Sequence, residues 1–218
     1  VPEKIPFMAT SCCPAWSMMA KKLFPERANC ISMAMTPMVL TARMIKQANP
    51  DDRICFIGPC AAKKLEASRR SVRSDVDFVL TFEELAGMFE AKEVDFSALE
   101  ASDDLQYGTA DGRGFAVGGG VAQAVVNYIK DKYPDREVKV ASAQGLADCK
   151  KMLMLAKAGK YNGYLLEGMG CPGGCIAGAG TLADPARTAT LLTKYKKDAP
   201  IQHSADSDFK DYGKLLHD

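Results

Sequence analysis

The chain has 218 residues, 47% of them hydrophobic, which is enough for one large domain or two small lobes with a core. Its 28 lysine and arginine residues nearly balance its 27 acidic residues, so the composition excludes a general electrostatic attraction to nucleic acid or to an anionic membrane. Because no apolar run approaches the ~20 residues that span a bilayer and the first residues form no cleavable apolar segment, we expect a cytoplasmic protein without membrane insertion.

Short β-rich runs alternate with helical patterns along the chain. The predicted strands cover residues 5–10, 53–58, 76–81, 136–142 and 161–169, and the predicted helices cover residues 15–24, 36–47, 82–91, 119–133 and 145–159. Most of the strands are expected to be buried on both faces. Thr36 before Pro37 is typical of a helix start, and Gly159 is typical of a helix end. The alternation predicts an α/β fold with parallel strands, in which function gathers at the loops that leave the carboxyl ends of strands.

Eight cysteines are many for a cytoplasmic chain, in which ordinary thiols stay reduced. A secreted disulfide framework fits poorly, since a chain of this length has ample apolar residues for a core, and metal binding or redox chemistry is therefore the leading class. Five cysteines lie just past predicted strand ends, in turns marked by proline or glycine: Cys12, Cys13, Cys60, Cys171 and Cys175. Cys55, inside a predicted strand, and Cys149, inside a predicted helix, are expected to be buried and inert.

The spacing of the thiols favours an iron–sulfur cluster over zinc. Pro-Gly-Gly separates Cys171 from Cys175, which disfavours a regular helix and lets backbone N–H groups approach a bound anion. A zinc site would more often use a two-residue spacing and histidine, and the two histidines, His203 and His217, lie near the C-terminus. Four thiolates from local and distant segments suit an iron–sulfur cluster. A zinc site and unligated buried thiols are the alternatives.

Two lysines follow Cys60 in a helical pattern. Lys64 is expected on the solvated face, whereas Lys63 could turn inward, where a cation would offset cluster charge and donate hydrogen bonds to an anionic ligand. Glu66 is three residues after Lys63, close enough on a helix to orient it. The glycine-rich segment 111–120 lacks the context of a dinucleotide loop, and we predict a close-packed glycine turn before a helix.

Three segments together resemble the signature motifs of the FeFe-hydrogenase catalytic domain: TSCCPAW (10–16), PCAAKKLE (59–66) and EGMGCPGGC (167–175). They occur in the family's order, and FAVGGGVAQA (115–124) is a fourth, weaker match. The resemblance implies the C-terminal portion of that domain, an α/β fold of two lobes with small, twisted, largely parallel sheets flanked by helices. The approximate lobes would be residues 1–105 and 106–200, followed by a tail at 201–218.

The resemblance also implies a metal centre, the H-cluster, that converts H2 reversibly into protons and electrons. A 4Fe–4S cluster would be held by Cys13, Cys60, Cys171 and Cys175. Cys175 would bridge it to a two-iron unit that carries CO, cyanide and a dithiolate amine. The implied partners are H2 and protons, a ferredoxin-like electron-transfer module and hydrogenase maturases, without which an isolated fragment could lack the cluster.

Other residues of the motifs would serve this centre. Cys12 would stay unligated and pass protons to and from the amine, and Ser32 would supply a hydroxyl in the same path. Lys63, oriented by Glu66, would donate a hydrogen bond to a cyanide. The walls of the pocket would be Phe115, Val121 and Met169.

The sequence departs from the family pattern in the segment GCIAGAGTL (174–182), which replaces a usual glycine run, and at two glycines. Gly58 stands where the family commonly has methionine near the open metal site, and Gly170 stands where alanine is usual. A larger and wetter pocket is expected to follow, which favours a divergent, sensory or regulatory branch. Two functions stay open: an enzyme that oxidises H2 or reduces protons, and an H2-sensing or non-catalytic iron–sulfur protein. Retention of Cys12 favours turnover, since a sensor can dispense with fast proton transfer.

Overall fold

The computed structural model describes residues 4–100, 102 and 108–212, in which helices and parallel strands alternate. The strands are β1 (Met8–Ala9), β2 (Cys55–Gly58), β3 (Phe78–Thr81), β4 (Lys139–Gln144) and β5 (Tyr164–Met169). The α-helices are α1 (Pro14–Leu23), α2 (Pro37–Ala48), α3 (Ala62–Ala67), α4 (Phe82–Ala91), α5 (Ala110–Arg113), α6 (Gly120–Lys132), α7 (Leu146–Lys157) and α8 (Pro185–Lys197). The predicted α/β fold with small parallel sheets is confirmed.

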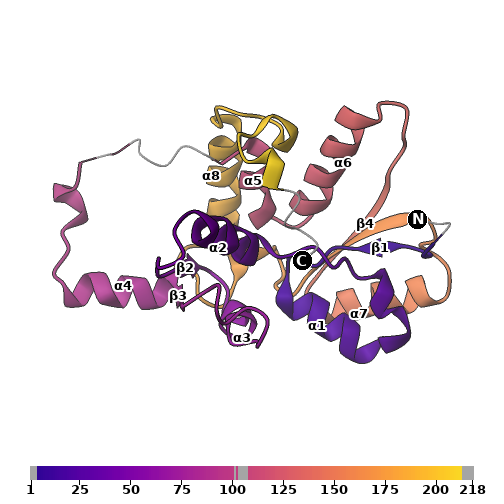
Figure 1. Ribbon diagram of the computed structural model, residues 1–218, viewed down its shortest axis with the longest axis horizontal. Helices are drawn as coiled ribbons and strands as arrows, with labels where there is room; N and C mark the ends of the chain where they lie inside the picture. Colours follow the sequence, from indigo (N-terminus) through magenta and orange to yellow (C-terminus); the bar gives the residue numbers. More distant parts are fainter. Residues whose placement is uncertain (1–3, 101, 103–107, 213–218) are drawn as a thin grey trace.

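One sheet has three parallel strands in the order β1-β5-β4, with Leu165 of β5 opposite Met8 on one side and Val140 on the other. Helices α1 and α7 cover one face and α6 lies on the other (Figure 1). Covering both faces is the usual arrangement for a parallel sheet, because its connections are helical. The core beneath it contains Trp16 of α1, Leu153 of α7 and Leu166 of β5, all fully buried or nearly so.

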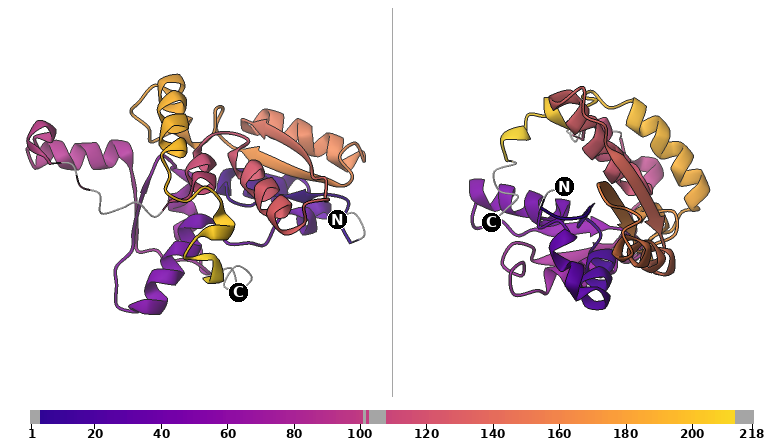
Figure 2. Two further views of the ribbon diagram at one scale, coloured as in Figure 1. Left: turned by 90° about the horizontal axis from the view of Figure 1, so that it is seen from above. Right: turned by 90° about the vertical axis from the view of Figure 1, so that its right-hand side faces the viewer.

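The second sheet consists of β2 and β3, paired in parallel from Cys55 opposite Phe78 to Gly58 opposite Thr81. Helix α2 packs on it through a small apolar cluster: Met38, Val39, Ala42, Val72 and Val76. Helix α4 begins directly after β3, where Thr81 and Glu84 form a capping box. No residue of α4 is buried, and α4 extends away from the body of the molecule (Figures 1 and 2).

The two predicted helix ends lie where the sequence places them. Thr36 precedes α2 and Pro37 is its first residue, but the Thr36 side chain makes no capping hydrogen bond and its hydroxyl is buried without a partner. Gly159 follows α7 with a φ of +87°, which is why glycine suits this position. The N–H groups of Gly159 and Lys160 donate to the carbonyls of Ala156 and Leu155, which closes the helix.

The expectation that most strands are buried on both faces is wrong for β2, β3 and β4. In β4, Ala141 and Ala143 pack on the core, whereas Val140 is 37% exposed, because β4 is an edge strand with one open face. The alternation along β2 likewise exposes Cys55, so this thiol is not the buried one that we expected. Cys149 in α7 is buried, as predicted.

The predicted boundary between the lobes, after residue 105, lies outside the described residues, and the division stays a prediction. The three-stranded sheet takes strands from both sides of this boundary, since β1 pairs with β5. Of the predicted tail, residues 201–212 are described, and they pack on α5: the N–H of Ala110 donates to the carbonyl of Ile201 at 2.8 Å. Within the described residues, none of the helices is both long enough and apolar enough to cross a membrane.

Candidate metal centre

The five cysteines predicted at strand ends gather around two adjoining cavities. Cys12 and Cys13 follow β1, Cys60 follows β2, and Cys171 and Cys175 follow β5. A cavity of about 200 Å³, here called the four-cysteine cavity, is lined by Cys13, Cys60, Cys171 and Cys175. A cavity of about 240 Å³, here called the Cys12 cavity, is lined by Cys12 together with Cys13, Cys60 and Cys175. The two cavities therefore share three thiols and also Met169.

The adjacent thiols of Cys12 and Cys13 differ in position because the backbone is extended there. Cys13 has φ −94° and ψ 110° and immediately precedes α1, whose first residue is Pro14. Successive side chains of an extended segment point in different directions. The Cys13 sulfur accepts a hydrogen bond from the N–H of Gly170 at 3.3 Å and lines both cavities. Cys12 lines only the Cys12 cavity. Trp16 anchors the segment, since its buried indole N–H donates to the carbonyl of Thr10 at 3.0 Å.

The loop that carries Cys171 and Cys175 depends on its glycines. Gly173 and Gly174 have φ of +93° and +87°, the left-handed region that other residues rarely adopt. A side chain on Gly174 would also meet the backbone N of Gly118 at 2.6 Å, so the loop packs closely on the glycine turn before α6. The predicted close-packed turn is confirmed there.

The two lysines after Cys60 lie in α3 and point in different directions. Lys63 is buried and lines the Cys12 cavity, and its Nζ lies 2.7 Å from Glu66 Oε2. Glu66 is also buried but lines neither cavity, so it contacts Lys63 on the side away from the Cys12 cavity. Lys64 is exposed, as expected, and pairs with Glu84.

The structure does not bring Ser32 to the Cys12 cavity. The Ser32 hydroxyl accepts a hydrogen bond from the N–H of Ala34 at 3.1 Å, and its own N–H donates to the carbonyl of Ala9 at 2.8 Å. These bonds join the segment to β1, next to the thiol motif. Ser32 lines neither cavity, and its role in a proton path stays a prediction.

The predicted pocket walls do lie together. Phe115, Val121 and Met169 line the Cys12 cavity, with Phe115 and Val121 on either side of the glycine turn and Met169 at the end of β5. Among the described residues, Lys63 supplies the one ammonium group of this otherwise apolar and thiol lining. A cavity of this kind excludes water and leaves a few polar atoms to orient a ligand.

Burial raises the pKa of three thiols of this region, those of Cys12, Cys171 and Cys175. The pKa of Cys12 is raised to about 12, first by burial and then by the nearby Cys13, Glu167 and Cys175, against a smaller lowering by Lys63. Burial likewise raises the pKa of Cys175 to about 11 and raises that of Cys171. The charged form is disfavoured where water is scarce, so these thiols hold their protons until a cation replaces them.

The chemistry of the donor set suits a bulky cluster. Within the described residues, no three His, Cys, Asp or Glu side chains converge closely enough to hold a single metal ion. The four thiols instead surround a cavity of about 200 Å³. A tetrahedral zinc site needs convergent ligands, whereas a 4Fe–4S cluster needs four thiolates around a space.

Glu167 is a site residue that the sequence analysis missed. Its side chain is fully buried in β5, and its carboxylate accepts hydrogen bonds from the N–H groups of Gly119 at 2.7 Å and Ala122 at 2.6 Å. Burial raises its pKa, and the N-terminus of α6 offsets part of that cost. Glu167 therefore ties β5 to the helix that carries Val121. A lone acid in the apolar run YLLEGM was the available signal.

The space left by the two unusual glycines is filled by neighbours. A Cβ on Gly58 would lie 2.8 Å from Cε1 of Phe56, and a Cβ on Gly170 would lie 2.9 Å from the Cβ of Ala15. The expectation of extra pocket volume is therefore wrong at both positions, because a side chain from the same strand or from α1 occupies the room.

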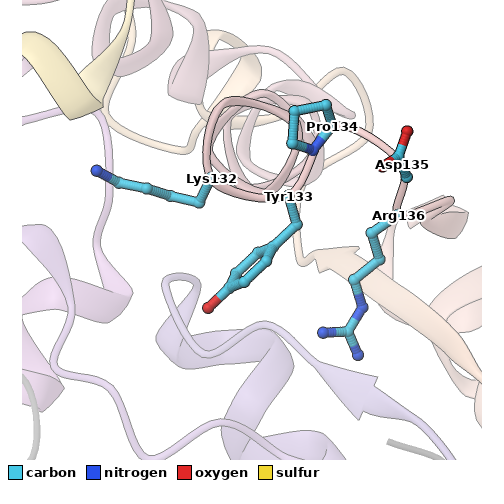
Figure 3. Close-up of a pocket in the computed structure, with 5 residues that line it drawn as sticks. All are labelled: Lys132, Tyr133, Pro134, Asp135 and Arg136. Atoms are coloured by element: carbon cyan, nitrogen blue, oxygen red, sulfur yellow. The ribbon is translucent and has the colours of Figure 1, made fainter.

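A separate hollow of about 520 Å³ lies at the turn after α6, lined by Lys132, Tyr133, Pro134, Asp135 and Arg136 (Figure 3). None of the predicted site residues belongs to it. None of these five residues carries a thiol, so this hollow does not compete with the two cysteine cavities as a site for an iron–sulfur cluster.

Comparison with known proteins agrees with this geometry. Residues 2–179 match the family model of the iron only hydrogenase large subunit, C-terminal domain. The chain belongs to this family. The chain spans between 37% and 55% of the hydrogenase relatives it matches first, so it corresponds to a part of those proteins.

Relatives in the iron-only hydrogenase family carry two kinds of name. The periplasmic [Fe] hydrogenase large subunit of Nitratidesulfovibrio vulgaris is 30% identical over 230 residues, which cover 84% of this chain and 55% of that protein. The cytosolic Fe-S cluster assembly factor NAR1 of Kluyveromyces lactis is 35% identical over 98 residues, 45% of this chain and 21% of that protein. Among solved structures, the apo [FeFe]-hydrogenase HydA1 from Chlamydomonas reinhardtii superimposes with a TM-score of 0.73 at 19% identity, covering 98% of this chain and 71% of that one. The fold is thus that of the FeFe-hydrogenase catalytic domain.

Proposed function

We propose that the chain is a catalytic part of an FeFe-hydrogenase, which converts H2 reversibly into two protons and two electrons and exchanges the electrons with a ferredoxin-like module. The observation that carries the proposal is that the two cavities adjoin and share Cys13, Cys60 and Cys175. The four-cysteine cavity offers four thiols for a 4Fe–4S cluster. The Cys12 cavity adds the thiol of Cys12 and the ammonium group of Lys63 to the shared thiols. This pair of sites matches what a cluster joined to a two-iron unit requires.

The residues divide into ligands and supporting groups. Cys13, Cys60, Cys171 and Cys175 would hold the 4Fe–4S cluster, and Cys175 would be shared with the two-iron unit. When bound, that unit supplies the open iron position at which H2 is split or formed. Lys63, held in place by its 2.7 Å contact with Glu66, would donate hydrogen bonds to the anionic ligands of that unit.

Cys12 would carry the proton. Its thiol lines the cavity without being one of the four that surround the neighbouring cavity. Because burial raises the pKa of Cys12, Sγ is protonated at neutral pH, and it would pass a proton on as it takes up another. Phe115, Val121 and Met169 exclude water from the same space, which prevents protons from leaking to solvent.

A second function, that of a non-catalytic iron–sulfur protein, draws support from one finding. Relatives named as cytosolic Fe-S cluster assembly factors match this chain, among them cytosolic iron-sulfur assembly component 3 of Bos taurus at 28% identity over 236 residues. The two functions share the four-cysteine cavity and differ in what the Cys12 cavity holds.

Infrared spectroscopy separates a hydrogenase from a non-catalytic iron–sulfur protein. The protein is loaded with iron and sulfide under anaerobic conditions and then treated with hydrogenase maturases, and the spectrum is searched for metal-bound CO and cyanide bands. The proposal predicts both sets of bands together with H2-dependent dye reduction. A protein that holds its 4Fe–4S cluster but shows no such bands after maturation would be a plain iron–sulfur protein.

Substitution of the adjacent thiols tests the division of labour. Cys12→Ala should leave the iron content nearly intact and lower H2 activity by about 100-fold or more, the range expected for loss of a proton-transfer group. Cys13→Ala should lose the 4Fe–4S cluster. Iron content and activity are measured on the same preparations, with Cys149→Ala as the control for a buried thiol that lines neither cavity. Equal loss of iron in the Cys12 and Cys13 variants would contradict the assignment.

A further inference from the structure

We propose that Gly178 is a positioning residue of the metal centre: the turn that it begins carries no thiol, yet it places Cys60 beside the other three ligands of the 4Fe–4S cluster. The ligand set rests on the proposed function, whereas the contacts of the turn do not. Residues 178–181, here called the 178–181 turn, follow the 3-10 helix Cys175–Ala177. Gly178 and Ala179 line the four-cysteine cavity. The turn belongs to the segment in which the sequence departs from the family's glycine run.

Cys60 comes from a different sheet than the other three thiols. Cys13, Cys171 and Cys175 follow β1 and β5 of the three-stranded sheet, and Cys60 follows β2 of the two-stranded sheet. Among the described residues, no strand of one sheet pairs with a strand of the other. The position of Cys60 relative to the other three thiols is therefore set by contacts outside the sheets.

The turn is hydrogen-bonded to backbone groups next to two of the thiols. The N–H of Gly178 donates to the carbonyl of Cys175 at 3.0 Å, and the N–H of Gly180 donates to the carbonyl of Pro59 at 3.0 Å. The carbonyl of Gly178 closes the turn, because it accepts from the N–H of Thr181 at 3.1 Å and from its hydroxyl at 2.8 Å. The turn thus links a ligand of one sheet to the residue that precedes a ligand of the other.

The contact with Pro59 reaches Cys60 directly. The carbonyl of Pro59 and the N and Cα atoms of Cys60 belong to one planar peptide group, so a shift of the oxygen also moves Cys60. A Cβ on Gly178 would lie 2.3 Å from this oxygen, a distance that real Cβ atoms essentially never show. Gly178 has φ −65° and ψ 156°, a conformation open to other residues, so glycine is needed here for space. The absence of a side chain at position 178 therefore allows the close approach that holds Cys60.

The turn also contacts the second strand of the two-stranded sheet. A Cβ on Gly180 would lie 2.4 Å from the Cβ of Thr81, and the N–H of Glu83 donates to the carbonyl of Gly180 at 3.3 Å. Thr81 ends β3 and lies opposite Gly58 at the end of β2. Because the turn contacts the ends of both strands, it holds the two-stranded sheet as a unit, and Cys60 with it.

Substitution of Gly178 tests the positioning role through the type of cluster that forms. The 218-residue chain is reconstituted with iron and sulfide under anaerobic conditions, and its iron content and EPR spectrum are recorded after mild oxidation. Gly178→Ala should resemble Cys60→Ala: a cluster held by three thiolates readily loses its fourth iron, so most of it should appear as the 3Fe–4S form. The wild-type chain and Gly87→Ala should keep the 4Fe–4S form, because nothing lies within 4 Å of a Cβ on Gly87.

A merely structural role of Gly178 would lower the amount of cluster without changing its type. That result, or a Gly178→Ala chain with the wild-type spectrum and iron content, overturns the proposal. A wild-type chain without a 4Fe–4S cluster would contradict the proposed function instead, and the next experiment then decides this inference alone.

Hydrogen exchange in the metal-free chain tests the contacts of the turn without any cluster. In Gly178→Ala, the N–H groups of Gly180 and Glu83 should exchange at least about 10-fold faster than in the wild type, because the hydrogen bonds that they donate are broken. Gly87→Ala should raise neither rate. If Gly178→Ala fails to fold, Thr181→Val replaces it, since it removes the hydroxyl that donates to the carbonyl of Gly178 and should shift both readouts in the same direction. Unchanged exchange at Gly180 and Glu83 in the variant used overturns the proposal.

Discussion

The adjacent lysines of α3 differ in burial: Lys63 pairs with Glu66 in the interior, and Lys64 pairs with Glu84 on the surface. Lys63 and Glu66 are 9% and 5% exposed in their side chains and contact each other at 2.7 Å. Lys64 and Glu84 form a pair of similar length on the surface. A buried pair must compensate its loss of hydration, and removing one partner leaves a buried charge, whereas a surface pair loses little.

Lys63→Met should therefore destabilise the chain by about 3–5 kcal/mol, because it leaves the Glu66 carboxylate buried and unpaired. The free energy of unfolding is measured with urea, and Lys64→Met is the matched control, expected to lose far less. Adding Glu66→Gln to Lys63→Met should recover part of the loss, since the buried charge is then gone. Equal effects of the two lysine substitutions would show that Lys63 is not buried with Glu66.

At this scale the sequence predicts which side chains line the cavities better than which contacts hold them in place. The five strand-end cysteines and the inward Lys63 follow from motif spacing and helix periodicity, and the structure gathers them at two cavities. Glu167 and Gly178 escaped notice, because each acts through a contact with a residue distant in the chain. Such contacts exist only once strands and helices have been packed together.

The central strand β5 is where the three-stranded sheet meets α1. Gly168 lies in β5 with an ordinary backbone conformation, and a Cβ there would overlap the indole of Trp16. Trp16 is fully buried and stands three residues after Cys13. The missing side chain at position 168 thus lets α1 approach the sheet, and this approach places Cys13 beside the loop that follows β5.

Gly168→Ala should destabilise the chain by at least about 1–3 kcal/mol, the usual cost of overpacking a core, and should lower the amount of iron bound on reconstitution. Gly87→Ala is the control: Gly87 is exposed in α4, nothing lies within 4 Å of its Cβ position, and alanine favours the helix by about 1 kcal/mol. Thermal unfolding and iron content are measured on both. A tolerated Gly168→Ala would contradict the close contact with Trp16.

Element types were predictable, whereas their exposure was not. Each of the five predicted strands and five predicted helices overlaps an observed one, because hydrophobic periodicity and the caps at Pro37 and Gly159 are local signals. Exposure of β2 and β4 depends on which strands lie at an edge, and that is decided by pairing across the chain. Helix α8 was missed although Asp184 and Pro185 mark its start, since its apolar residues are few and none of its residues is buried.

At the scale of the whole molecule, the four-cysteine cavity joins parts that are distant in the chain. Its thiols come from the loops after β1 and β5 of one sheet and after β2 of the other. The two sheets share no paired strand among the described residues. A cluster bound by all four thiols would cross-link them, so its binding energy would add to the stability of the fold.

Iron binding should consequently become tighter as pH rises, because the thiols lose protons when they bind iron. Burial raises the pKa of Cys171 and Cys175, the latter to about 11, so each thiol must release a proton when it binds iron. Proton release makes binding tighter as pH rises, and this trend continues throughout the neutral range because the thiols there are still protonated. Iron bound in competition with a chelator is measured between about pH 6.5 and 8.5, together with the protons released into weak buffer. Cys149→Ala should leave the slope unchanged, since that thiol lines neither cavity. Loading that is independent of pH would mean that the thiols are already ionised in the metal-free chain, against the burial that surrounds them.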